Sequence, residues 1–484
     1  MILRRLPEAI IVLGILYCAG IAVHGVAMFG PASPLSSKTL LLLAGVSATL
    51  AAVLALALLL PRAARSNLAL VLVSLGATIF AAEVFFFVTD HGSPVVRRMM
   101  EAARDAGRPI DSRTRLEVIR DLRSHGVDAV PFMGSRGLTV TGLHGHAVPV
   151  VGGVSMATTV LCNESGRYLI YDADEHGFNN PRELHGRVPL QVALVGDSYT
   201  HGACVPHEAS IADHIRAAFP RTLNLGAVGA GPLSGLARFM EYAASLRPRF
   251  VVWHWFEGND LADLQREFAQ EPLRRYLTTD APFGLKARQD EIDHVSRAVI
   301  NARMQHSEYG ADAVTEILLL RSIRTRLAAA MPAALRLKVW GTGELTTDEL
   351  LAVSRRILTT VRDTTRSWGG ELVMVYLPDS TRYCDAIPAW REFCIEKGAQ
   401  RRRRDWVVGP RDDLLEMFAR LSLPVVDGHA AFLSTGRSPD DFFYYAGSHY
   451  SPFGYRVIAE ATLRELRSRL AASEPSSSTR SPGQ

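Results

Sequence analysis

The sequence predicts an α/β protein: a three-layer α/β/α domain built on a doubly wound parallel sheet, preceded by three transmembrane helices and a small mixed α/β segment. From residue 191 onward, short apolar runs alternate with helical stretches, which is typical of a parallel sheet with helical crossovers on both faces. Near the N-terminus lie three long apolar stretches, and 48% of the 484 residues are hydrophobic. Each stretch has about 20 residues, enough to cross a hydrocarbon core of about 30 Å as a helix.

The three candidate spans are Ile10–Met28, Leu40–Leu60 and Leu68–Val88. A cleaved signal peptide is the alternative for the first of them. Two further spans follow without a clear cleavage site, which disfavours that alternative.

Positive charge in short loops predicts the orientation of the spans. Arg4 and Arg5 precede the first span, Arg62 and Arg65 lie between the second and third, and only Lys38 lies between the first and second. Arg97 and Arg98, just after the third span, argue the other way. We therefore expect a multi-pass protein of the inner (cytoplasmic) membrane, with its N-terminus inside and everything after about residue 90 extracytoplasmic.

The predicted domains are a membrane domain over residues 1–90, a linking segment with helices and short strands over 91–190, an α/β domain over 191–470 and a disordered tail over 471–484. Within the linking segment, Val148–Val151 and Thr158–Cys162 are strand-like. The turn-rich stretch Asp172–Pro181 favours a capped, hydrogen-bonded loop over a cation site.

The α/β domain contains five apolar runs that read as buried parallel strands. They are Val192–Val195, Thr222–Leu225, Phe250–Trp255, Leu372–Leu377 and Pro424–Val426. Residues 261–345 form a charged, helical insertion between the third and fourth runs. It can be interpreted as a lid packed on the core or as a segment that contacts the membrane surface.

Four short motifs follow one another along this domain. Three of them, Gly196–Gly202, Asn224–Gly229 and Gly258–Asp260, each follow an apolar run. The fourth, His449–Pro452, opens a helix near the end of the chain. Because a doubly wound sheet gathers the ends of its strands at one edge, we expect the first three motifs to converge.

These motifs, in this order, resemble those of the SGNH hydrolases, also called the GDSL esterase/lipase family. The resemblance covers residues 190–470, and it implies the flavodoxin-like sheet of that family. It also implies that Ser198 is the nucleophile, that His449 is its general base, and that Ser198, Gly229 and Asn259 form the oxyanion hole. Gly226 and Gly231 are the alternatives to Gly229, which only the resemblance favours.

The sequence also supports His449 as a base in its own right. Ser451 can cap a helix that begins at Pro452, and one apolar stripe along that helix would fix it on the sheet. The alternative is a core or capping histidine.

One position departs from the family pattern. The family places an aspartate three residues before the base, and Ala446 stands there. We expect a Ser198–His449 dyad first. A displaced acid, Asp440 or Asp441, comes second, and an inactive site third.

Four of the five cysteines lie in the part expected outside the membrane, and the fifth, Cys18, lies in the first span. Disulfides persist in oxidising compartments. Cys384 with Cys394 would bridge a local loop, and Cys162 with Cys204 would then tie the linking segment to the helix after Ser198. Three pairings are open, as are four unpaired thiols.

The expected function is that of a membrane-anchored, extracytoplasmic serine esterase acting on O-acyl groups of an envelope polysaccharide or a lipid. A polysaccharide O-acetyltransferase with the same site is the alternative, as is a non-catalytic interaction protein of an envelope polysaccharide assembly. We expect no cofactor and no metal. The net charge of +4 gives no case for nucleic acid.

Overall fold

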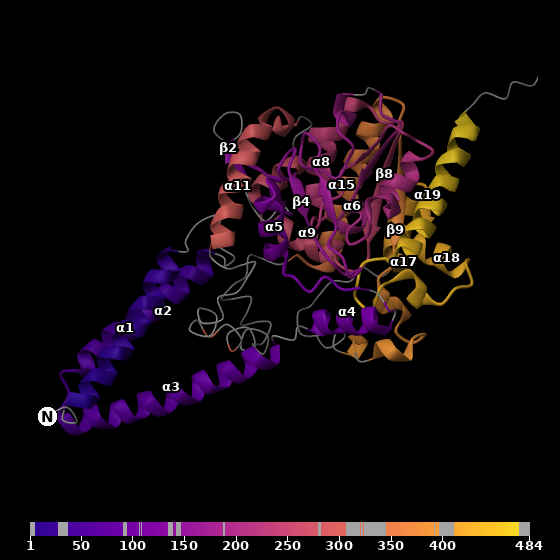
Figure 1. The fold of residues 1–484 in the computed structure, drawn as a ribbon. Helices are drawn as coiled ribbons and strands as arrows, with labels where there is room; N and C mark the ends of the chain where they lie inside the picture. The colour runs from indigo at the N-terminus through magenta and orange to yellow at the C-terminus, as the bar shows by residue number, and fades with distance from the viewer. Residues whose placement is uncertain are drawn as a thin grey trace, which may run out of the picture. The chain divides into compact units, whose positions relative to one another are not determined.

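The computed structural model (Figure 1) describes residues 5–27, 37–90, 94–105, 107, 109–133, 139–141, 147–186, 189–278, 282–305, 320, 323, 345–391, 393–395 and 411–473. The chain divides into two compact units. One comprises residues 1–97 with 298–343, and the other comprises residues 98–297 with 344–484. Residues 98–190 therefore cluster with the α/β domain.

All three apolar stretches of the first unit are helical. They form α1 (Leu6–Ala27), α2 (Ser37–Ala57) and α3 (Arg62–Asp90). By length and hydropathy, two helices among the described residues could cross a membrane, Leu6–Val23 and Arg62–Phe86. Within α2 the apolar part found among the described residues, Ala44–Ala57, is shorter, so two of the three expected spans meet this criterion.

An ion pair joins the beginnings of α1 and α3. Arg65 Nη1 lies 3.0 Å from Glu8 Oε1. The two helix starts therefore lie at the same end of the helical group.

The second unit contains the predicted five-stranded parallel sheet. Its strands are β6 (Val192–Val195), β7 (Thr222–Asn224), β8 (Phe250–Phe256), β9 (Glu371–Leu377) and β10 (Val425–Asp427). They lie in the order β10-β9-β8-β6-β7, and every neighbouring pair is parallel. Each predicted strand is present within one or two residues of its expected bounds.

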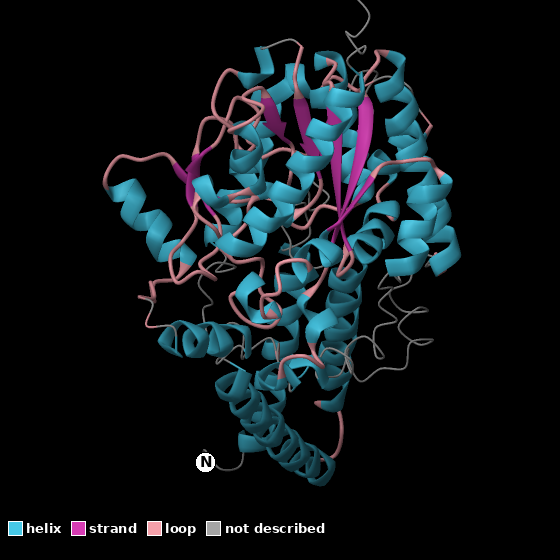
Figure 2. Ribbon diagram, turned by 90° about the vertical axis from the view of Figure 1, so that its right-hand side faces the viewer, coloured by secondary structure: helices cyan, strands magenta, loops and turns pink. Residues whose placement is uncertain are grey.

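Helices cover both faces of this sheet (Figure 2). Val192, Leu194 and Val252 share an apolar cluster with α7 (Ile211–Arg216), α18 (Gly428–Leu433) and α19 (Pro452–Ser473). Their alternate neighbours point to the opposite face, where the side chains of Val195 and Trp253 approach Gly235 so closely that a Cβ there would lie 2.8 Å from the indole. On that face lie α8 (Pro232–Arg238), α9 (Asp260–Phe268), α15 (Thr347–Ser367) and α17 (Arg411–Arg420).

A smaller, mixed sheet is built by the linking segment. Its strands are β1 (Ala129–Pro131), β4 (Thr158–Val160) and β5 (Ile170–Asp172), with β1 parallel and β5 antiparallel to β4. β2 (Thr139–Thr141) and β3 (Ala147–Pro149) form a separate antiparallel pair. Two helices precede β1, α4 (Pro94–Asp105) and α5 (Arg115–Ser124), and Thr114 caps α5 in a reciprocal pair with Glu117.

The insertion over residues 261–345 is helical where it is described. It contains α9, α10 (Glu271–Arg274) and α11 (Gln289–Gln305). Most of residues 306–344 of the insertion lie outside the described residues, as does most of the predicted disordered tail.

Candidate active site

Ser198 begins a short helix immediately after the central strand of the site. β6 is fully buried, and α6 (Ser198–His201) follows it after only Gly196 and Asp197. Asp197 caps α6 by accepting a hydrogen bond from Tyr199 N at 3.0 Å. A side chain on Gly196 would meet Thr200 Oγ1 at 2.2 Å, so the tight turn requires glycine. As the first residue of a helix, Ser198 has a backbone N–H that no helical carbonyl can accept.

The three expected oxyanion donors follow three adjacent strands. β6 lies between β8 and β7 in the sheet. Ser198 follows β6, Gly229 follows β7 and Asn259 follows β8. Since parallel strands end at one edge, the donors lie along the same edge, with Ser198 in the middle.

Hydrogen bonding distinguishes Gly229 from its two neighbouring glycines. Gly226 N donates to Asn224 Oδ1 at 2.9 Å, and Gly231 N donates to Glu267 Oε1 at 2.7 Å. No described residue accepts the N–H of Gly229. Gly229 has φ +70°, and no atom lies within 4 Å of the position of a Cβ, so it needs glycine for its backbone conformation and faces open space.

Asn259 precedes α9 without capping it through its side chain. Its buried side-chain oxygen has no hydrogen-bond partner among the described residues. Hydrogen bonds among the described residues do not occupy its side-chain Nδ2 either, so the amide N–H is left to donate, as an oxyanion donor requires.

The loop that carries His449 is fixed by its own hydrogen bonds. Ser448 Oγ accepts from Tyr444 N at 3.0 Å and from Tyr445 N at 3.1 Å. Ser451 Oγ accepts from Gly454 N at 3.2 Å, so it caps α19 as expected. The imidazole of His449 is thereby held at the N-terminal edge of α19.

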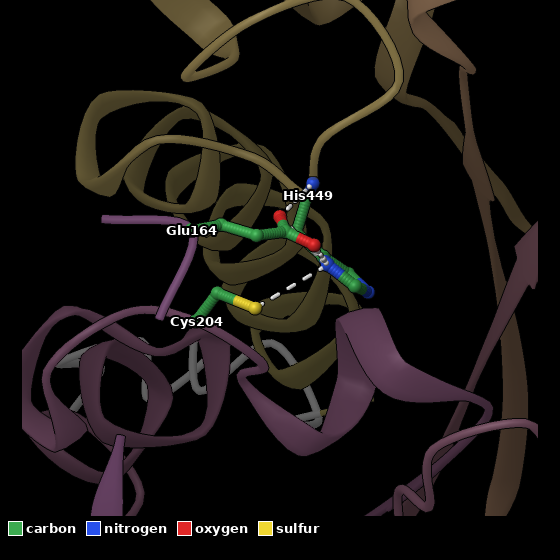
Figure 3. Close-up of side chains that lie close together, drawn as sticks. All are labelled: Glu164, Cys204 and His449. Atoms are coloured by element: carbon green, nitrogen blue, oxygen red, sulfur yellow. Dashed lines mark hydrogen bonds and ion pairs between the residues drawn. The ribbon is translucent and has the colours of Figure 1, made fainter. Parts of the chain in front are cut away.

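Both nitrogens of His449 have partners. Nε2 lies 2.8 Å from Ser198 Oγ. Nδ1 lies 3.0 Å from each carboxylate oxygen of Glu164, and His449 N donates to Glu164 Oε2 at 2.7 Å (Figure 3). The arrangement is a nucleophile, a base and an orienting acid in series.

This geometry corrects the expectation of a dyad and of a displaced aspartate. The acid is Glu164, 285 residues before His449. Asp440 and Asp441 lie in a turn before the loop, where Asp441 contributes its backbone carbonyl to Ser451 Oγ at 2.6 Å. No described hydrogen bond joins either carboxylate to His449, because Glu164 already occupies Nδ1.

Glu164 lies in the turn between β4 and β5, outside the part of the chain that resembles a hydrolase. No local motif surrounds it. One signal was available in the sequence. Glu164 lies two residues after Cys162, so a Cys162–Cys204 bridge would bring Glu164 close to the helix that begins with Ser198.

The structure contains that bridge. Cys162 is bonded to Cys204, and Cys384 is bonded to Cys394. Cys204 Sγ lies 3.5 Å from His449 Nδ1, beside the carboxylate of Glu164 (Figure 3). The one remaining cysteine, Cys18, is free.

Charge and burial act in opposite directions on this site. Burial disfavours the protonated imidazole, but Glu164 outweighs it, so the pKa of His449 is raised above its ordinary value. Burial alone would raise the pKa of Glu164, yet pairing with His449 lowers it. The acid is therefore a carboxylate at neutral pH, and it favours the imidazolium that forms when serine loses its proton.

A group of buried charges lies behind the nucleophile. Arg238 Nη2 donates to Gly196 O at 2.9 Å. Burial raises the pKa of Asp197 to about 6 and raises that of Asp260 well above its usual range. Asp260 accepts from Phe256 N at 2.9 Å, so it fixes the end of β8 next to Asn259.

Two groups of side chains have the composition of metal ligands, Glu164–Cys204–His449 and Asp174–Glu175–His185. In the first, the sulfur is in a disulfide and both imidazole nitrogens have partners. In the second, Asp174 accepts from the backbone of His176 and Phe178 at 2.9 Å and lies 3.0 Å from His185 Nε2. These contacts organise the predicted capped loop, so neither group needs a metal to explain it.

The sequence matches no family model and no curated protein sequence. Its structural neighbours are GDSL-type hydrolases and acetyl esterases. A lipolytic protein of the G-D-S-L family from Desulfitobacterium hafniense is 11% identical, with 57% of this chain and 98% of that chain covered and a TM-score of 0.29. The lipase/acylhydrolase from Enterococcus faecalis is 16% identical, with 58% and 96% covered and a TM-score of 0.28.

A variant of an acetyl xylan esterase from Geobacillus stearothermophilus is 13% identical, with 58% of this chain and 95% of that chain covered and a TM-score of 0.29. These scores are low, so the assignment of a reaction rests on the geometry of the site itself.

Proposed function

We propose that this protein is a serine esterase of the SGNH type that works through an acyl-enzyme. One observation carries the proposal: Ser198 Oγ, His449 and Glu164 form a continuous series of hydrogen bonds of 2.8 and 3.0 Å at the carboxyl edge of the sheet. A serine hydroxyl is a weak nucleophile until a base removes its proton, and this arrangement supplies the base and the acid that orients it.

In the proposed reaction, Ser198 Oγ attacks an ester carbonyl while His449 Nε2 takes the serine proton. The carbonyl oxygen becomes an oxyanion, stabilised by the N–H groups of Ser198 and Gly229 and the amide of Asn259. His449 then gives its proton to the leaving alcohol, which leaves an acyl group on Ser198. A second hydroxyl, activated by His449, releases the acyl group and restores the enzyme.

The second hydroxyl decides the class of reaction. Water gives deacylation, and a sugar hydroxyl gives O-acylation of a polysaccharide. We propose hydrolysis as the primary activity, with acyl groups of an envelope polysaccharide or lipid as the substrate, and no metal or organic cofactor.

The proposed location is the inner membrane, with the esterase outside it and an envelope polysaccharide assembly as its surroundings. Two helices long enough to span a bilayer and two disulfides in the α/β unit support this location. An oxidising space beyond the cytoplasmic membrane is where such disulfides persist.

The test is labelling of the detergent-solubilised full chain with a fluorophosphonate, alongside turnover of short-chain acyl esters with and without sugar acceptors. Ser198→Ala is expected to abolish labelling and turnover while the protein stays folded, as measured by circular dichroism. Acyl transfer to the sugar at the expense of free acid would identify a transferase. An unlabelled wild-type chain would instead identify a non-catalytic protein.

A further inference from the structure

The turn that carries Glu164 is attached mainly to its own surroundings. Leu169 N donates to Cys162 O at 2.7 Å and closes the β4–β5 hairpin. Asp111 N donates to Gly166 O at 2.7 Å, and Asn163 Nδ2 donates to Asp111 O at 3.0 Å. These bonds give the turn its shape, but none of them sets its distance from Ser198 or His449.

The Cys162–Cys204 disulfide is the covalent link across that distance. A hydrogen bond of the same hairpin, 2.9 Å between Tyr171 Oη and His201 Nε2, also reaches α6, but from β5, farther along the chain from Glu164. Cys162 precedes Glu164 by two residues, and Cys204 follows directly on the turn that ends α6. Cys204 is 1% exposed and belongs to a small apolar cluster with Leu161, Leu169 and Tyr171 of the hairpin. The covalent bond therefore joins the acid-bearing turn to the segment that begins with the nucleophile.

The disulfide also contacts the base. Cys204 Sγ lies 3.5 Å from Nδ1 of His449, the same nitrogen that Glu164 binds (Figure 3). The sulfur therefore lies directly beside Nδ1. Among the described residues, the three hydrogen-bonding contacts of the Glu164 carboxylate are all to His449, so a turn that moves away would remove the carboxylate from the imidazole.

We propose that the Cys162–Cys204 disulfide is a positioning element of the triad: it holds Glu164 on His449, and its loss lowers turnover through Glu164. This inference rests on the proposed esterase function for its kinetic consequence. Its structural content, a dependence of the Glu164–His449 contact on the disulfide, is independent of that function.

The chain offers a matched control, because its second disulfide touches none of the three residues. The test compares Cys162→Ala/Cys204→Ala with Cys384→Ala/Cys394→Ala, each with and without Glu164→Gln. Alanine is preferred at 204 because a serine hydroxyl there could bond to Nδ1.

We expect the first pair to lower kcat about tenfold or more, with KM changed less than about twofold, since an orienting acid acts on the transition state. We expect the same pair to cost less than about twofold in kcat when Glu164→Gln is already present, because contributions made through one group do not add. An equal loss in both backgrounds, an equal loss from the control pair, or no loss would overturn the proposal.

A readout without substrate separates this inference from the proposed function. Titration of His449 by NMR of ¹⁵N-histidine protein, assigned with His449→Ala, should show its pKa lowered by the first pair and by Glu164→Gln, but not by the control pair. If the wild-type chain cleaves no ester while this shift appears, the positioning role stands and the esterase proposal falls. An unshifted His449 in the first pair overturns the positioning role.

If the first pair fails to fold, the same readouts are taken on folded Cys384→Ala/Cys394→Ala protein treated with a dithiol. Of the five cysteines of the sequence, that variant keeps Cys18, Cys162 and Cys204, so Cys162–Cys204 is the one disulfide left to reduce. The dithiol passes two electrons and two protons to the bond and becomes a cyclic disulfide. We expect the reduced protein to lose turnover and to show a lowered pKa of His449, with both restored on reoxidation. Unchanged turnover and an unchanged pKa would contradict the proposal.

Discussion

At the scale of the residue, the carboxylate that contacts His449 does not come from the position that the family pattern assigns to it. Ala446, which occupies the place of the family's aspartate, is 3% exposed and has no polar group to offer. Glu164 supplies the carboxylate from a turn that lies 285 residues earlier in the chain. It contacts His449 through the ring nitrogen and through the backbone N–H, so it fixes both the tautomer and the position of the base.

Removing the charge of Glu164 should be costly. We expect Glu164→Gln to lower kcat by about 100-fold or more, because the amide cannot stabilise the imidazolium and can bind the wrong tautomer. Asp440→Asn and Asp441→Asn serve as matched controls, and each should lower turnover less than about tenfold. Steady-state kinetics on folded protein measures all three variants. A larger loss of turnover in an aspartate variant than in Glu164→Gln would identify that aspartate as the orienting acid.

The pH dependence of the reaction follows from the raised pKa of His449. The base works when neutral, so kcat/KM should fall as pH falls through that pKa. Because Glu164 raises it, the acid limb should lie above the ordinary histidine value of about 6.5. In Glu164→Gln the limb should move to lower pH, and a limb that stays in place would mean that Glu164 is not the cause.

At the scale of the element, the ends of strands and helices are held by buried carboxylates. Glu267 of α9 accepts hydrogen bonds from the N–H groups of Gly231, Leu233 and Ser234 at 2.7, 3.0 and 3.1 Å. It thereby satisfies the first turn of α8 and anchors the loop that carries Gly229. The position of Gly229, the proposed oxyanion donor, thus depends on a side chain from a neighbouring helix.

We expect Glu267→Ala to destabilise the protein by about 2–4 kcal/mol, since it leaves several buried donors without an acceptor. It should also lower kcat through the displaced Gly229 while Ser198 and His449 stay intact. Thermal or denaturant unfolding and ester turnover measure the two effects. Glu271→Ala is the control, because its ion pair with Arg275 is exposed and should contribute less than about 1 kcal/mol.

At the scale of the whole molecule, the chain consists of two compact units. In the first, the Glu8–Arg65 ion pair places the starts of α1 and α3 at one end. In the second, the mixed sheet of residues 129–172 and the five-stranded sheet are joined by a disulfide and by the Glu164–His449 contact. The linking segment therefore contributes residues, Cys162 and Glu164, to the candidate active site of the α/β unit.

Topology provides a test at this scale. A periplasm-active reporter fused after residue 92 should be active, and one fused near Arg62 should be inactive, because positive charge is retained on the inner side. Reporter activity in whole cells measures this. The opposite pattern would place the α/β unit in the reducing cytoplasm, where its two disulfides would not persist.

The sequence by itself predicted the five parallel strands and the positions of Ser198, Asn259 and His449 next to them. It could do so because each is encoded locally: buried parallel strands are continuous apolar runs, and the turns that follow them need particular residues such as Gly196 and Gly229.

Only the tertiary structure decided the acid, the cysteine pairing and the choice of Gly229 over its neighbours. Glu164 meets His449 across 285 residues, and nothing near either residue in the chain encodes that contact. Four cysteines allow three pairings whatever their spacing. Gly226, Gly229 and Gly231 differ in whether an acceptor from elsewhere occupies their N–H groups. Such contacts arise when the chain brings distant groups together, so they exist only in the folded protein.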